Sequence, residues 1–271
     1  MQRYCFIFVL LLAACSATGG GATTRPSPVG EPVMLNVAAK AGDRVRTRRE
    51  LSVTEIDMTG QKLLVKLDES FATEVLDVDA AGNPMRVSRA YERSFRSLQH
   101  AGGEEKNEHG ALEGCSFELT QLADGVTIKL LSGTAKPEDY GDLLIQGFDT
   151  VIVPRGPARK GDAWEIDING NPYFRGLLKL AGLEAERNVL RAELFDVSGD
   201  IARISLRWRV SGTLESGVPM VFELAGELRV DSAQRLVTEV TLSGGKTDSS
   251  GRPLQQIAMK LNREHVSGWY R

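Results

Sequence analysis

The chain has 271 residues, of which 42% are hydrophobic and 25% charged, a composition typical of one large or two small globular domains. It carries 33 basic and 36 acidic residues, which gives a formal charge of -3. Nucleic-acid-binding proteins normally show an excess of basic residues, so this balance argues against nucleic acid as a partner.

Residues 1–14 have the pattern of a signal peptide. Arg3 supplies a positive charge, and the apolar stretch 4–14 is too short to span a bilayer. The stretch ends in LAAC at residues 12–15, which resembles the lipobox of bacterial lipoproteins. This resemblance implies cleavage before Cys15 and acylation of its thiol and new amino group with chains such as palmitate.

Acylation would make the membrane a partner of this protein through the acyl chains on Cys15, because two or more chains give a stable anchor. Ser16 follows the cysteine, where enterobacterial lipoproteins held in the inner membrane carry Asp. By that resemblance we expect a lipid-anchored protein of the bacterial envelope and periplasm, with the outer membrane favoured over the inner one. The alternative is an ordinary secretory signal that leaves Cys15 as a free thiol.

The segment 15–32 is rich in Gly, Ser, Thr and Pro and has few large apolar side chains. Such a segment buries too little surface to offset its ordering entropy. We therefore predict a lipidated flexible tether at 15–32, followed by a single β-rich domain at 33–271.

Hydrophobic residues recur with a period of two along most of this domain, which is typical of strands with one apolar face. The pattern predicts about ten strands, and the clearest runs lie at 63–75, 85–95, 202–210, 220–230, 236–242 and 257–261. Turn signals at 79–84, 124–125, 198–200 and 244–251 separate them, so we expect antiparallel hairpins. The polar stretch 100–114 is predicted to be a loop.

Two stretches have helical features. In 136–148, Pro137 and two acidic residues fit a helix start, and in 171–182, Asn171 fits an N-cap and Gly182 a stop. Two short helices cannot cover the apolar faces of about ten strands. The sequence thus predicts a mainly β fold, an antiparallel sheet curled into a half-barrel or barrel with two short helices. The alternatives are a β-sandwich and two similar halves, at about 33–131 and 160–271.

This organisation resembles envelope lipid-handling proteins of the lipoprotein-carrier type, in which helices plug the apolar cavity of a half-barrel. The resemblance is architectural and rests on the lipobox, the tether and the long strands. Separately, the segment VPRGPARKGDAWEID at 153–167 is similar to a sequence segment that recurs in uncharacterised secreted β-rich bacterial proteins. By this similarity, Trp164 is expected to begin a strand. That similarity implies no activity.

No catalytic constellation is evident. The sequence has no G-x-S-x-G elbow and no nucleotide-binding glycine motif. His100 and His109 flank three glutamates, but their spacing favours a solvated loop over a metal site, and 77–83 fits a hairpin turn better than a calcium loop. Cys115 alternates with apolar residues and is expected to be a small buried hydrophobe. We therefore expect no enzyme, no metal and no cofactor.

Arginines alternate with other residues in two runs, one containing Arg44, Arg46, Arg48 and Arg49 and the other Arg203, Arg207 and Arg209. This pattern favours the solvent-exposed face of a strand, or an edge strand protected against aggregation. The alternative is contact with anionic lipid or a partner.

Two functions remain. The first is a non-enzymatic structural or interaction role, in which the outer face of the sheet meets envelope proteins. The alternative is a carrier of a lipid or other hydrophobic ligand on a concave apolar face. The candidate lining residues for that carrier are Leu206, Trp208, Val210, Met220, Phe222 and Leu224.

Overall fold

The computed structural model describes residues 29–266, except 58, 124, 142, 146–148, 155, 169–173, 175–177, 179–182 and 215–216. The predicted signal peptide, Cys15 and most of the predicted helix at 171–182 therefore lie outside the described residues. What the sequence indicates about these segments stays a prediction.

The N-terminal part of the chain forms seven strands: β1 (Val29–Leu35), β2 (Arg44–Ile56), β3 (Lys62–Val78), β4 (Pro84–His100), β5 (Lys106–His109), β6 (Ser116–Gln121) and β7 (Val126–Ser132). The middle contains α1 (Pro137–Tyr140), α2 (Asp149–Ile152), β8 (Gly156–Lys160) and β9 (Ala163–Ile166). The C-terminal part forms β10 (Leu183–Ser198), β11 (Ile201–Leu214), β12 (Pro219–Asp231), β13 (Leu236–Asp248) and β14 (Pro253–His265).

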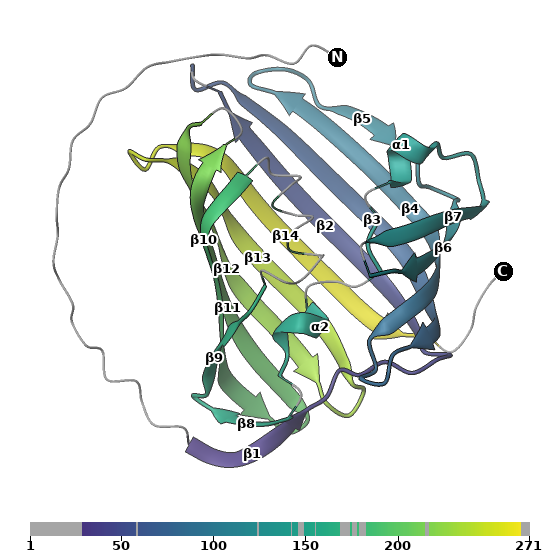
Figure 1. Ribbon diagram of the computed structural model, residues 1–271. Helices are drawn as coiled ribbons and strands as arrows, with labels where there is room; N and C mark the ends of the chain where they lie inside the picture. The colour runs from purple at the N-terminus through teal and green to yellow at the C-terminus, as the bar shows by residue number, and fades with distance from the viewer. Residues whose placement is uncertain are drawn as a thin grey trace, which may run out of the picture.

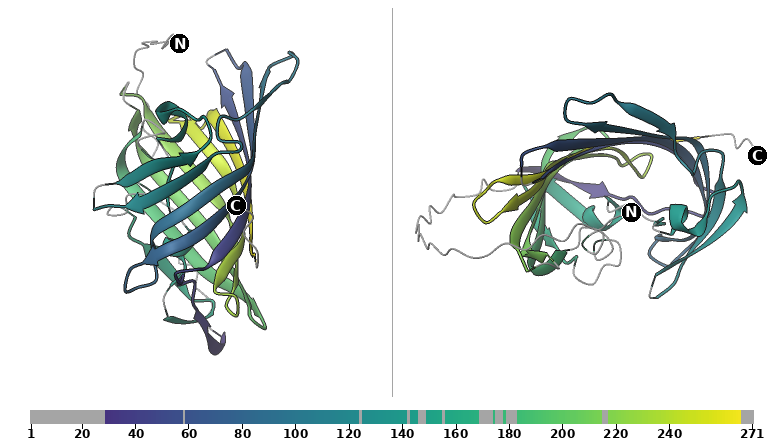
Figure 2. Two further views of the ribbon diagram at one scale, coloured as in Figure 1. Left: turned by 90° about the vertical axis from the view of Figure 1, so that its right-hand side faces the viewer. Right: turned by 90° about the horizontal axis from the view of Figure 1, so that it is seen from above.

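Twelve strands make one antiparallel sheet in the order β7-β6-β4-β3-β2-β14-β13-β12-β11-β10-β9, with β5 beside β4. The pairing of β14 with β2 joins the C-terminal strands to the N-terminal ones. Strands β1 and β8 form a separate two-stranded sheet. The large sheet is strongly curved but not closed, and seen from above it follows an open arc (Figure 2). The predicted curled sheet is confirmed as an open half-barrel, and the sandwich alternative is not what forms.

Two apolar cores occupy the inner, concave face of this arc. The larger lies on β10 to β13, where Ile152 of α2, Ile168 and Phe174 pack against the sheet. In Figure 1, α2 lies over this part of the concave face. The smaller core lies at the other end of the arc, on β3, β4 and β6, and includes Phe117 and Cys115. Cys115 is 2% exposed, which confirms that it is a small buried hydrophobe.

The structure differs from the sequence-based expectations in several elements. The described part contains fourteen strands rather than about ten, and β1 begins at Val29, inside the predicted tether of 15–32. Among the described residues of 136–148, the predicted helix is limited to α1, although its predicted start is correct. Asp139 accepts a hydrogen bond from the backbone of Lys136 (2.9 Å), which caps the helix. The turn α2 was not predicted, and the predicted loop at 100–114 contains the short strand β5.

The glycines at 244 and 245 do not form a turn as predicted but lie inside β13, whereas the turn follows at 248–252. Their φ angles are 153° and 158°, and a Cβ on either would collide with a carbonyl oxygen of the adjacent strand. Glycines inside strands allow a sheet to bend sharply. Gly226 on β12 is equally crowded, by Thr241 of β13, so glycines contribute to the curvature on both strands of this pair.

Candidate functional site: the concave face of the sheet

The six predicted lining residues do converge on the concave face of β11 and β12. The register pairs Val210 with Phe222 and Trp208 with Leu224, so these side chains share one face. None of the six is more than 8% exposed, and all belong to the larger core. In this structure they contact protein rather than an open surface.

Trp208 shows how this part of the face is covered. Its ring lies edge-on to both Phe174 and Phe222, with centroids 5.3 Å away in each case, and its Nε1 donates to Asn188 Oδ1 (2.7 Å). At the edge strand β9, Trp164 donates from Nε1 to the carbonyl of Ile152 (2.9 Å), which holds α2 against the sheet. Trp164 does open a strand, as the resemblance implied.

A second apolar area of the concave face lies between the two cores, on β14, β2, β3 and β4. The register places Ile257, Val53, Val65 and Leu98 in one row across the sheet, and Met259, Leu51 and Leu67 in the next. We call these two rows the concave strip: Ile257, Val53, Val65, Leu98, Met259, Leu51 and Leu67. Figure 1 shows these strands side by side at the centre of the arc.

The concave strip is less covered than the cores. All seven side chains are half-buried, and those on β2, β3 and β4 belong to neither core. Neighbouring strands lie about 4.8 Å apart, so the longer row, from β14 to β4, extends about 14 Å across the sheet. The strip is thus an elongated apolar surface framed by two packed cores.

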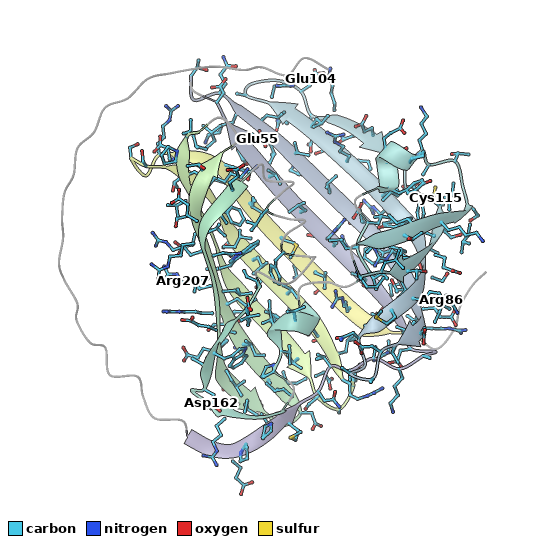
Figure 3. The ribbon with its side chains drawn as sticks, viewed as in Figure 1. Glu55, Arg86, Glu104, Cys115, Asp162 and Arg207 are labelled. Carbon is cyan, nitrogen blue, oxygen red and sulfur yellow. The ribbon has the colours of Figure 1, made fainter. Side chains whose placement is uncertain are left out.

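Polar groups limit the concave strip along the strands. On one side, Arg49 donates from Nε to the buried carboxylate of Glu69 (3.0 Å), and these residues face each other on β2 and β3. On the other side, Gln255 donates to Glu55 Oε1 (3.0 Å), with Lys246 beside them on β13. Burial lowers the pKa of the Lys246 ammonium below its usual value, and the Glu55 carboxylate partly opposes this effect. Figure 3 shows Glu55 near the end of its strand.

Sequence reasoning missed the strip as a site. It recognised the alternation of Leu63, Val65 and Leu67, and of Ile257 and Met259, but placed the candidate lining on the strands that are β11 and β12. The signal that distinguishes the two areas is the middle segment with Phe174, which covers the C-terminal strands and cannot be assigned to a face from sequence alone.

The other candidate groups occupy structural positions. His109 contacts Glu113 (Nδ1 to Oε1, 2.9 Å), whereas His100 lies at the end of β4. Asp79 accepts backbone hydrogen bonds from Ala81 and Asn83, so 79–84 is the predicted hairpin turn. In the part of the chain that the structure describes, no three His, Cys, Asp or Glu side chains gather as metal ligands.

The alternating arginines of β2 lie mainly on the convex face. Arg44 pairs with Glu74 (3.0 Å), Arg46 with Glu92 (3.0 Å) and Arg48 with Asp68 (3.6 Å). Arg49 is the exception, since it faces inward to Glu69. On β11, Arg203 pairs with Glu227 (2.7 Å). These ion pairs are consistent with the solvent-exposed strand faces that the sequence predicts.

No family model matches this chain, and no curated protein matches it. Three solved structures align with it at low similarity. DynF from the dynemicin biosynthesis pathway of Micromonospora chersina is 10% identical with a TM-score of 0.23, over 93% of this chain and 94% of that one. A de novo designed transmembrane β-barrel is 7% identical with a TM-score of 0.18, over 84% and 99%. A putative AttH protein from Nitrosomonas europaea is 8% identical with a TM-score of 0.18, over 88% and 99%. At these TM-scores the alignments establish neither a shared fold nor a function.

Among the described residues, no helix is long and apolar enough to cross a bilayer.

Proposed function

We propose that this protein is a non-enzymatic, lipid-anchored carrier of the bacterial envelope, which holds a hydrophobic ligand such as an acyl chain on the concave strip. The observation that carries the proposal is the half-buried state of this strip between two packed cores. Each Å² of apolar surface left in water costs about 25 cal/mol of free energy. A hydrophobic ligand that covers the concave strip therefore stabilises the protein. The proposed location in the bacterial envelope rests only on the predicted signal peptide and on Cys15.

The shape of the strip favours an extended chain over a compact ring system. Its two rows run across several strands, whereas polar side chains limit its width at Arg49–Glu69 and at Gln255–Glu55. A ligand with one polar end fits this arrangement, because Lys246, Gln255 and Glu55 offer a cation, an amide and a carboxylate at the rim.

The test uses the full chain carrying Cys15→Ser, so that no covalent acyl chain competes. Native mass spectrometry should detect co-purifying lipid, and a dansyl-labelled fatty acid should bind and be displaced by unlabelled fatty acid. Val53→Glu introduces a charge into the strip and should weaken probe binding at least tenfold. The matched control is Ser52→Glu, one residue away on the convex face and opposite Lys66, which should bind the probe like the parent chain. Absence of both co-purified lipid and probe binding would overturn the carrier proposal.

A structural or interaction role is the second candidate. It is favoured by the burial of all six predicted lining residues, because that half of the concave face is already filled by protein. In this case the full chain purifies without lipid, its thermal stability does not respond to added fatty acid, and cross-linking in envelope preparations captures a protein partner reproducibly.

A further inference from the structure

The convex face of β10 and β11 carries a groove that the carrier proposal does not use. Its volume is about 390 Å³, and it is lined by Arg187, Val189, Arg191, Arg207, Arg209 and Ser211. We call it the arginine groove. Side chains alternate along a strand, so these residues lie on the face opposite to the larger core, and Figure 3 shows Arg207 pointing away from the concave side.

The register brings the cations of this groove unusually close. Arg191 lies directly opposite Arg207, and Arg187 lies opposite Ser211. Like charges that face each other across two strands destabilise a sheet. Neighbouring positions on one face are about 5–7 Å apart, which is within reach of an arginine side chain, so the guanidinium groups can converge on one bound group.

Carboxylates neutralise only part of this charge. Glu165 pairs with Arg191 (2.7 Å), and Glu223 pairs with both Arg207 (2.7 Å) and Arg209 (3.5 Å). Arg187 has no ion-pair partner among the described residues. In these ion pairs, two carboxylates are shared by three of the four guanidinium groups, so the cations of the groove are only partly paired.

We propose that the arginine groove binds a phosphate group, with Arg187 and Arg209 as principal donors and the Ser211 hydroxyl beside them. A phosphate ester carries up to two negative charges, which the partly paired guanidinium groups of the groove can accept. The planar guanidinium fork donates two parallel hydrogen bonds to phosphate, and a groove of this size accommodates a small molecule or a headgroup. This site lies on the opposite face from the concave strip and does not depend on it.

The phosphate can come from a soluble compound or from a lipid headgroup. Isothermal titration of the full chain with inorganic phosphate and pyrophosphate tests the first source. Co-sedimentation with phosphatidylcholine vesicles, with and without phosphatidic acid, tests the second. Binding in either arm supports the site and identifies the source, and binding should weaken as salt concentration rises.

Two variants tie the binding to the groove. Arg187→Gln leaves no carboxylate without a partner, so the sheet should keep its stability while phosphate or vesicle binding falls at least tenfold. Arg187→Lys keeps the charge but loses the fork and should recover only part of it. Arg203→Gln is the control, because Arg203 lies on the same convex face, on the neighbouring strand β11, but outside the groove. Failure to bind in both arms overturns the proposal, as does equal loss in Arg203→Gln and Arg187→Gln.

Discussion

Phe174 packs edge-on against Trp208, with ring centroids 5.3 Å apart and an angle of 80° between the rings. Phe174 comes from the middle of the chain and is 2% exposed, whereas Trp208 lies on β11. This contact fixes the middle segment on the concave face of the C-terminal strands. It also explains why the residues selected from sequence as a ligand lining are covered by the protein itself.

Phe174→Ala should lower the free energy of unfolding by about 3–5 kcal/mol, because it removes a buried ring and leaves a cavity against Trp208. Urea denaturation followed by tryptophan fluorescence measures this change. The control is Leu131→Ala on β7, where the side chain is 47% exposed and the expected change is within about 0.5 kcal/mol. Similar losses in the two variants would contradict the packing role of Phe174.

The faces of the strands were predictable from the sequence, whereas their cover was not. The alternation of apolar residues on β11 and β12 identified the side chains that point inward, because a period of two assigns each residue to a face. It does not report what lies above that face. Trp208 on β11 and Val53 on β2 share the same pattern, yet the first is buried beneath Phe174 and the second is half-buried.

Turn prediction failed where glycine has a role within a strand. Gly244 and Gly245 have the composition of a turn, and no local signal reveals that the backbone of β12 or β14 approaches too closely for a side chain. In contrast, the turn at 79–84 was predicted correctly because Asp79 satisfies its backbone hydrogen bonds locally. Hydrogen bonds within a turn can be predicted from the sequence, whereas contacts between strands that are distant in the sequence cannot.

Gly244→Val should destabilise the sheet by about 2–3 kcal/mol, because the added side chain meets the carbonyl of Glu223 and forces an unfavourable backbone conformation. Thermal or urea unfolding measures the loss, and hydrogen exchange should locate it in β12 and β13. Ser243→Val, on the exposed side of the same strand, should be nearly neutral. An unchanged stability in Gly244→Val would show that the curvature does not depend on this glycine.

Glu113 should titrate below its ordinary pKa of 4.5. The pKa of this carboxyl is lowered mainly by the hydrogen bond from the Ser94 backbone and then by His109. A folded pKa below the unfolded one contributes stability that is complete above pH 4.5 and is lost as the pH falls through the folded pKa. Carboxyl NMR titration measures the midpoint, which should remain low in His109→Ala because the Ser94 contact persists. A midpoint at or above 4.5 would contradict this assignment.

Cys15→Ser should abolish incorporation of radiolabelled palmitate and release the protein from the membrane fraction, because the proposed anchor is covalent. Labelling of growing bacteria followed by fractionation tests both effects. The buried Cys115 provides the control, since Cys115→Ser should leave labelling unchanged. Retention of palmitate in Cys15→Ser would eliminate the lipobox assignment while leaving the fold untouched.

The pair formed by Arg49 and Glu69 limits the concave strip on one side along β2 and β3. Glu69 is 5% exposed, so Glu69→Ala should cost about 1–3 kcal/mol by leaving Arg49 without this partner. The double variant Arg49→Met with Glu69→Leu should recover most of that loss, because apolar residues of similar size often replace a buried ion pair without penalty.

The same double variant enlarges the strip along the strands and should bind the dansyl-labelled fatty acid at least as tightly as the parent chain. The control pair is Arg203 and Glu227, which is about half exposed on the convex face, so that removing both charges should change stability by less than about 1 kcal/mol and leave probe binding unaltered. Weaker probe binding in the Arg49 and Glu69 double variant would place the ligand on the ion pair rather than on the apolar rows.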